Sequence, residues 1–171
     1  MSSIPLLPGL SFDVRDLLSG SLPVFYPSTV AITVPEGLSP ASLRDSPVGK
    51  ELVHQQTWYD TYPWTTQPIA PGVYQLRLPI PDSNRKTFDE RKKLLLPGEE
   101  AAPLVLVELA MLCLNKAGHT DPLKGGRVRC PESTGRYRIG LSWYDGRLYI
   151  HDIWAGGRYG SVWLAGVRRA P

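Results

Sequence analysis

Residues 137–154 read YRIGLSWYDGRLYIHDIW, which is the pattern of two antiparallel strands joined by a tight turn. Apolar and polar side chains alternate on both sides of Asp145-Gly146, and this period of two predicts strands with one buried face. Asp-Gly suits the two central positions of a type I′ turn, where both residues need a positive φ. The stretch therefore predicts a β-hairpin, around which we expect the rest of the chain to pack.

The turn also predicts which residues lie opposite one another. On the apolar face the expected pairs are Trp143/Leu148, Leu141/Ile150, Ile139/Asp152 and Tyr137/Trp154. On the other face they are Tyr144/Arg147, Ser142/Tyr149, Gly140/His151 and Arg138/Ile153. A slip of one residue would move every apolar side chain to the wrong face, so the turn and the alternation support a single register.

The apolar run LVLVELAMLCL predicts the main helix, which we place at residues 99–117. Glu99 and Glu100 suit its positive end, and Pro103 suits its first turn. Because the run is apolar on nearly all sides, we expect the helix to be buried, most simply against the apolar face of the hairpin.

Shorter patterns predict the remaining elements. We expect strands at 29–34, 74–80 and 161–168, short helices at 12–19, 39–46 and 87–96, and a loop at 119–129. Thr87 and Glu90 have the spacing of a capping box, which opens the helix at 87–96. The order of elements predicts a single α+β domain over residues 1–171. Its largely antiparallel sheet includes residues 73–80 and a C-terminal β-meander at 137–168, packed on the long buried helix.

The composition is that of an ordinary globular protein, with 42% hydrophobic and 20% charged residues among 171. No segment approaches the roughly 18 apolar residues of a membrane span, and residues 1–12 lack the basic flank of a signal peptide. We therefore expect a soluble, cytoplasmic protein without membrane contact. Cys113 and Cys130 are compatible with a disulfide, but the lack of a secretion signal favours free thiols.

The net charge of +3 is unevenly distributed along the chain. Residues 121–171 contain nine Lys and Arg against four Asp and Glu, a net charge of +5, whereas residues 1–120 have a net charge of −2. The basic C-terminal half favours an anionic partner such as nucleic acid.

Residue types that build catalytic and metal sites do not occur at informative spacings. The histidines are far apart: His54, His119 and His151. Cys130 and His151 lack the spacing of a zinc site. They would act as a nucleophile pair only within hydrogen-bond reach, and a loop thiol beside an outward-facing histidine is the simpler interpretation.

A second catalytic pattern is equally incomplete. Asp82 followed by Glu90-Arg91-Lys92 has the residue types of a nuclease site in which two carboxylates bind Mg²⁺ beside a lysine. The spacing is short, however, and the second group falls in a predicted helix. The sequence therefore predicts no catalytic residue, no metal ligand and no cofactor.

Three groups remain as candidate binding residues. The aromatic loop comprises Trp58, Tyr59, Tyr62 and Trp64; it predicts either a binding platform or a cover over the core. The basic segment comprises Arg85, Lys86 and Lys92; it predicts either phosphate contacts or a solvated helix face. Asp152 falls on the apolar face, where it must be paired, hydrogen-bonded or at the sheet edge, or else an acid at the rim of a cleft.

These observations favour a non-enzymatic binding or protein-interaction module, with a protein partner or a second copy of the chain bound at the aromatic loop. The alternative is binding of nucleic acid or another polyanion through the basic C-terminal half. A hydrolase or nuclease with an unrecognised site is the third interpretation.

Overall fold

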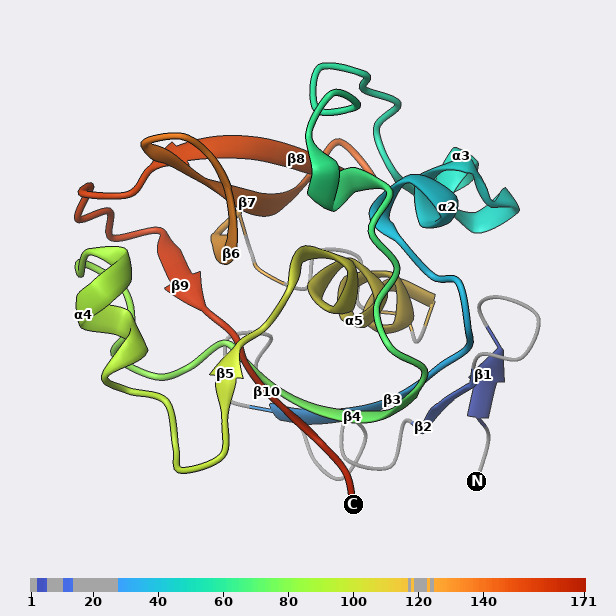
Figure 1. Ribbon diagram of the computed structural model, residues 1–171, viewed down its shortest axis with the longest axis horizontal. Coiled ribbons are helices and arrows are strands. Elements are labelled where there is room, and N and C mark those ends of the chain that lie inside the picture. The colour runs from blue at the N-terminus through green and yellow to red at the C-terminus, as the bar shows by residue number, and fades with distance from the viewer. Residues whose placement is uncertain (1–2, 6–10, 14–27, 117, 119–122, 124) are drawn as a thin grey trace.

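The computed structural model describes residues 3–5, 11–13, 28–116, 118, 123 and 125–171. Within these residues the longest helix lies between two sheets (Figure 1). The helical elements are α2 (Pro40–Asp45), α3 (Pro47–Leu52), the 3-10 turn η1 (Pro63–Thr65), α4 (Phe88–Lys92) and α5 (Leu104–Lys116). The strands are β1 (Ser3–Pro5), β2 (Ser11–Asp13), β3 (Ser28–Val34), β4 (Gly72–Leu78), β5 (Glu100–Ala101), β6 (Arg127–Thr134), β7 (Tyr137–Tyr144), β8 (Arg147–Trp154), β9 (Val162–Leu164) and β10 (Gly166–Arg169).

The described strands form a six-stranded sheet in the order β1-β2-β3-β4-β10-β5 and a four-stranded sheet in the order β8-β7-β6-β9. Neighbours pair in antiparallel fashion, except that β9 runs parallel to β6. The predicted α+β class with a largely antiparallel arrangement is confirmed. Among the described helices, none has the length and apolar character needed to cross a membrane.

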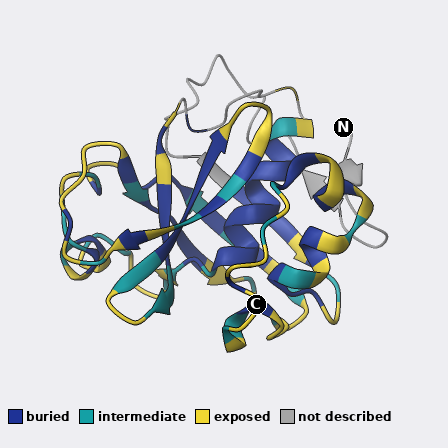
Figure 2. Ribbon diagram, turned by 90° about the horizontal axis from the view of Figure 1, so that it is seen from above, coloured by how far each residue is buried: buried dark blue, intermediate teal, exposed yellow. Residues whose placement is uncertain are grey.

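Helix α5 is enclosed from both sides. It contacts β6, β7 and β8 on one side and β3 on the other, and every residue from Leu104 to Leu114 is buried (Figure 2). This burial confirms the prediction from its apolar run. It also explains why a single sheet could not bury this helix, because a helix that is apolar on all sides needs to be covered on all sides.

The helix begins later than the sequence predicts, at Leu104 instead of residue 99. Glu100 and Ala101 form β5, and Glu99 binds Arg77. Proline disfavours helical geometry in the residue before it, which is Ala102 here. The carbonyl of Pro103 accepts the first helical hydrogen bonds. The predicted role of Glu99 and Glu100 at the positive end of the helix is therefore wrong.

The predicted hairpin is confirmed in full. All eight pairs from Tyr144↔Arg147 to Tyr137↔Trp154 lie in the expected register. Asp145 and Gly146 have φ values of 48° and 73°, as a type I′ turn requires. The buried face covers α5 as expected.

The predicted strand at 161–168 is two strands that belong to different sheets. Strand β9 pairs with β6, and after Ala165 the chain continues as β10 between β4 and β5. Consequently β4 and the hairpin do not share one sheet, contrary to the prediction. A short local pattern cannot distinguish one long strand from two consecutive strands that belong to opposite sheets.

Residues 127–129, predicted as part of a loop, begin strand β6, and Cys130 is buried within it. The pairing of β6 with β7 shifts between Arg129 and Ser133. Pro131 lies inside this shift, which is consistent with its lack of an N–H for the ladder. Cys113 and Cys130 are both buried free thiols.

The shorter predicted elements are mostly present. Strands β3 and β4 pair along their full length, and the capping boxes Ser39/Ser42 and Thr87/Glu90 open α2 and α4. Ser11, the expected helix cap, lies in β2 instead, and residues 14–19 of that predicted helix lie outside the described residues. One continuous cluster of buried apolar side chains joins both sheets to α5, so the described residues form a single compact domain.

Candidate functional site

The four-stranded sheet uses one face to cover α5, and its other face is partly open. Side chains alternate along a strand, so residues on the face away from α5 follow from the register. We call the uncovered part the open sheet face and define it by six residues: Arg127, Ser142, Tyr144, Arg147, Tyr149 and His151. Segment 80–95 covers the other part, because Ile80, Phe88 and Leu164 form a small second core there.

The open sheet face is hollowed. A depression of about 280 Å³ is lined by Gly125, Arg127, Ser142, Trp143, Tyr144, Tyr149 and His151. Its walls therefore combine aromatic rings with a positive charge.

Aromatic rings form a continuous ladder on this face. Tyr149 stacks on His54 with ring centroids 4.2 Å apart, and His151 lies nearly parallel to Tyr149 at 6.1 Å. Tyr144 meets Tyr149 edge-on at 5.9 Å and is 70% exposed. The backbone N–H of His54 donates to the carbonyl of Leu148, which holds the histidine beside the sheet. Tyr144 is the mostly exposed ring of this group, whereas His54, Tyr149 and His151 are half-buried.

Ser142 and His151 form the shortest polar contact of the open sheet face. Ser142 Oγ lies 2.6 Å from His151 Nε2. Burial and the positive charge of Arg127 lower the pKa of His151, whereas Asp152 opposes the shift. The ring is therefore neutral at neutral pH, so that Nε2 can accept the serine proton.

A hydroxyl beside a neutral imidazole has the components of a nucleophile and its base. A working pair also needs a group that orients the imidazole. Within the part of the chain that the structure describes, no carboxylate hydrogen-bonds to His151. A hydrolase at this pair therefore stays a prediction.

The charge of the open sheet face is positive. Arg127 and Arg147 are both exposed, and neither forms an ion pair with any described residue. Free guanidinium groups at a surface of this kind attract phosphates without a competing carboxylate.

The aromatic loop is divided by the structure. Trp58 is 40% exposed, Tyr62 and Trp64 are half-buried, and Tyr59 is fully buried. Tyr59 packs against Trp58 and Trp64, so it belongs to the core and cannot meet a partner from the surface. The interpretation as a cover over the core therefore holds for Tyr59, and the binding platform stays a prediction for the other three residues.

Trp64 borders a second hollow. Its indole N–H donates to the carbonyl of Ser133, and its ring stacks on Tyr62. The hollow has a volume of about 290 Å³ and is lined by Pro40, Trp64, Gln67, Pro68, Ile69, Pro103, Val105 and Glu132. The predicted protein-partner surface at Trp58, Tyr62 and Trp64 stays a prediction.

The basic segment lies beside the open sheet face and not on it. The backbone N–H of Arg85 donates to the carbonyl of Tyr159, so this segment packs on the connection between β8 and β9. Lys86 is half-buried, and Lys92 is exposed and forms an ion pair with Asp89. These charges therefore border the positive region of β6 to β8.

Asp152 meets the expectation of a position at the sheet edge. It is exposed on β8, which is the outermost strand of its sheet. Cys130 and His151 do not meet, because Cys130 belongs to the core and His151 faces outward. Among the described residues, no three His, Cys, Asp or Glu side chains are grouped as a metal site requires.

Part of this site could be predicted from the sequence. The predicted register already placed Ser142, Tyr149 and His151 together on the outer face of the hairpin. His54 and Arg127 are distant in the chain, and no local pattern could have joined them to it.

Comparison with known proteins provides no family for the chain: no protein-family model, no curated protein and no solved structure matches it.

Proposed function

We propose that the protein is a binding module for single-stranded nucleic acid and that the open sheet face is its binding surface. The observation that carries the proposal is the aromatic ladder of His54, Tyr149 and His151, with the exposed ring of Tyr144. Arg127 and Arg147 belong to the same face and form no ion pair among the described residues. Bases stack on exposed aromatic rings, and arginines contact the backbone phosphates.

Several features make a single strand a better ligand than a duplex. Stacking needs bases with free π faces, which a paired helix does not offer. The ladder lies along neighbouring positions of β8 and continues to His54, so it can accept successive bases. Ser142 and His151 add hydrogen-bonding groups at the floor of the hollow, where they can contact a base edge.

Fluorescence anisotropy of a labelled 15-nucleotide single strand tests the proposal. The protein should bind it, and Tyr144→Ala should weaken binding by about tenfold, the cost of one lost stacking contact. Arg127→Gln should also weaken binding and should make the slope of log affinity against log salt shallower by about 0.7. A duplex of the same sequence should bind less tightly.

Two matched variants control this experiment. Trp154→Ala removes an exposed aromatic ring from the opposite face of β8, and Arg168→Gln removes a positive charge from the other sheet. Both should bind as wild type does. The proposal fails if no single strand binds at 50 mM salt, or if the control variants lose as much affinity as those on the open sheet face.

A further inference from the structure

Three side chains form a row across the open sheet face. Arg127 on β6 lies opposite Ser142 on β7, and Ser142 lies opposite Tyr149 on β8. Residues that face each other across neighbouring antiparallel strands have Cβ atoms about 4.5–5.5 Å apart. All three line the hollow of about 280 Å³. In liquid water this volume would hold about nine molecules, which is room for a single nucleobase.

Tyr144 provides the flat surface on which such a base stacks. Its ring is 70% exposed and lines the same hollow. Tyr144 follows Ser142 by two residues on β7, so it is a diagonal neighbour of Arg127. Diagonal neighbours lie about 7–8 Å apart, which is within the reach of aromatic and long side chains. A base stacked on Tyr144 therefore has the Arg127 guanidinium within reach of its edge.

Arg127 brings free hydrogen-bond donors to the hollow. Among the described residues, none forms an ion pair with Arg127 and none accepts a hydrogen bond from its guanidinium. Ser142 and His151, in contrast, are bonded to each other at 2.6 Å. The charged group that faces a ligand is therefore a planar fork of donors, which matches two neighbouring acceptors.

The backbone of Arg127 is fixed from both sides. Strand β6 lies between β7 and β9, and the N–H of Arg127 donates to the carbonyl of Ser161 at 2.7 Å. Arg147, the other arginine of this face, follows the Asp145-Gly146 turn at the start of β8 and is not among the residues that line the hollow. The two arginines therefore have different positions: Arg127 faces a bound base, and Arg147 lies outside the hollow.

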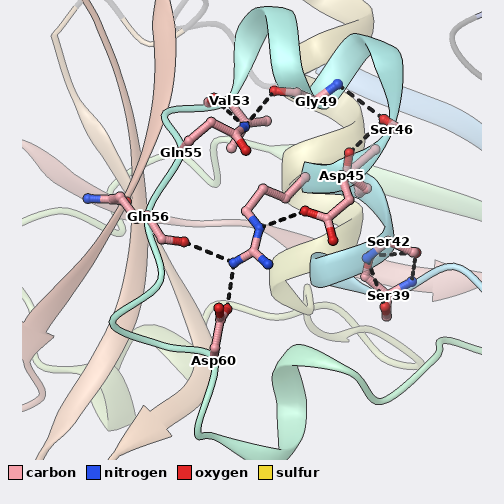
Figure 3. A network of polar contacts seen from close by, with 11 residues as sticks. Ser39, Ser42, Asp45, Ser46, Gly49, Val53, Gln55, Gln56 and Asp60 are labelled. Atoms are coloured by element: carbon pink, nitrogen blue, oxygen red, sulfur yellow. Dashed lines mark hydrogen bonds and ion pairs between the residues drawn. The ribbon is translucent and has the colours of Figure 1, made fainter.

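The aromatic wall of the hollow is held rigidly from behind. His54 stacks on Tyr149, and the residues that follow His54 are bound to α2 and α3 (Figure 3). Arg44 donates from Nη1 to the carbonyl of Gln56 at 2.9 Å, and the side-chain amide of Gln55 donates to a carbonyl of α3 at 3.2 Å. A wall that is fixed before binding favours discrimination between ligands of similar size, because it does not adjust to each of them.

We propose that Arg127 selects guanine over adenine in the hollow by donating two hydrogen bonds to O6 and N7 of the guanine base. Guanine is the purine that presents two acceptors side by side on this edge, and arginine is the residue that most often binds them. Adenine is of similar size, but its N6 amino group is a donor and would face the guanidinium. The inference rests on the proposed function, because it specifies which purine the open sheet face prefers.

Base selection by Arg127 is compatible with the salt dependence expected above. A guanidinium that binds a base remains within about one Debye length, ~8 Å, of the adjacent phosphates, so its charge still displaces counterions from the strand.

Competition of short strands against the labelled 15-nucleotide strand tests the inference. Each competitor has four thymidines and one central variable base. The guanine strand should compete about tenfold better than the adenine strand. Inosine keeps O6 and N7 and should behave as guanine does, whereas 7-deazaguanine lacks N7 and should lose most of the preference. Equal competition by the guanine and adenine strands would overturn the inference and leave the proposed function in place, whereas failure of every strand to bind would remove both.

Two matched variants locate the preference. Arg127→Gln should reverse it, because glutamine pairs with N6 and N7 of adenine. Arg147→Gln removes the other unpaired charge of the open sheet face, so it should weaken both strands alike and keep the tenfold ratio. Both side chains are exposed, so both variants should keep the Tm of wild type.

An Arg127→Gln variant that still prefers guanine, or an Arg147→Gln variant that loses the preference, would overturn the assignment to Arg127. The comparison of inosine with 7-deazaguanine uses the wild-type protein, so it decides the matter even where a variant does not fold.

Discussion

At the scale of single residues, Glu108 is the least compatible with its surroundings. It lies in the middle of α5 among apolar side chains and is fully buried. Neither of its carboxyl oxygens has a hydrogen-bond partner among the described residues. Burial and the nearby carboxyl of Glu132 raise the pKa of Glu108 well above its ordinary value. Burial therefore disfavours the charged form of this group at a cost in stability.

We expect Glu108→Leu to stabilise the protein by about 1–3 kcal/mol at pH 7, because it removes a buried polar group without a partner. The folded state binds the proton of Glu108 more tightly than the unfolded chain does. Wild type consequently loses stability as pH rises above the unfolded pKa of about 4.3, and the advantage of the variant grows over that range. Urea denaturation at several pH values measures both effects.

Glu36→Gln serves as the control, because Glu36 is exposed in a turn. It should change stability by less than about 0.5 kcal/mol. A destabilised Glu108→Leu variant would mean that the carboxyl has a partner in solution.

At the scale of elements, the hairpin of β7 and β8 determines how the four-stranded sheet meets α5. Trp143 is 4% exposed and packs opposite Leu148 on the covered face. Its neighbour Tyr144 points to the open sheet face and is 70% exposed. Of these two adjacent aromatic residues, Trp143 thus belongs to the core and Tyr144 to the surface.

Trp143→Ala should cost roughly 3–5 kcal/mol of unfolding free energy, the usual loss for a large buried ring. Tyr144→Ala should cost less than about 0.5 kcal/mol, because its ring is mostly in solvent. Chemical denaturation of both variants compares them directly, and equal losses would contradict the register. The small loss expected for Tyr144→Ala also makes it a clean variant for the binding experiment.

At the scale of the whole molecule, the two sheets are joined by a direct crossing. The chain leaves β9, passes through buried Ala165 and enters β10 at Gly166. A side-chain carbon added at Gly166 would lie 2.9 Å from Glu99 Oε2 and 3.2 Å from Leu95 Cδ2. Glu99 is itself held by Arg77, so it has little freedom to move away.

We expect Gly166→Ala to destabilise the protein by about 1–3 kcal/mol through this overpacking. Thermal and chemical unfolding measure the loss. Gly98→Ala is not a suitable control, because Gly98 has a φ of 79° and would add backbone strain. Ala170→Gly, past the end of β10, should have a much smaller effect, and a comparable loss would show that the crossing tolerates a side chain.

The candidate site, like the fold, was predictable only where it depends on local sequence patterns. Ser142, Tyr149 and His151 are assigned to one face by turn chemistry and alternation, which are local. Arg127 depends on strand β6, whose pattern is interrupted by Pro131. His54 reaches the ladder through the bridge of Val53 with Leu148 and through its own N–H, which donates to the carbonyl of Leu148. The partners of Arg91 and Arg129 depend on packing between α4 and the sheet, which no sequence spacing reports.

The sequence by itself determined the hairpin register, the burial of the long helix and the capping box of Thr87 and Glu90, because alternation, turn geometry and capping act over a few residues. Only the tertiary structure decided that residues 161–168 divide between two sheets, that Tyr59 is core while Trp58 is surface, and that Arg91 and Arg129 are buried without an ion pair among the described residues. These outcomes depend on which distant segments share a layer, and that is settled by the burial of α5 on all sides.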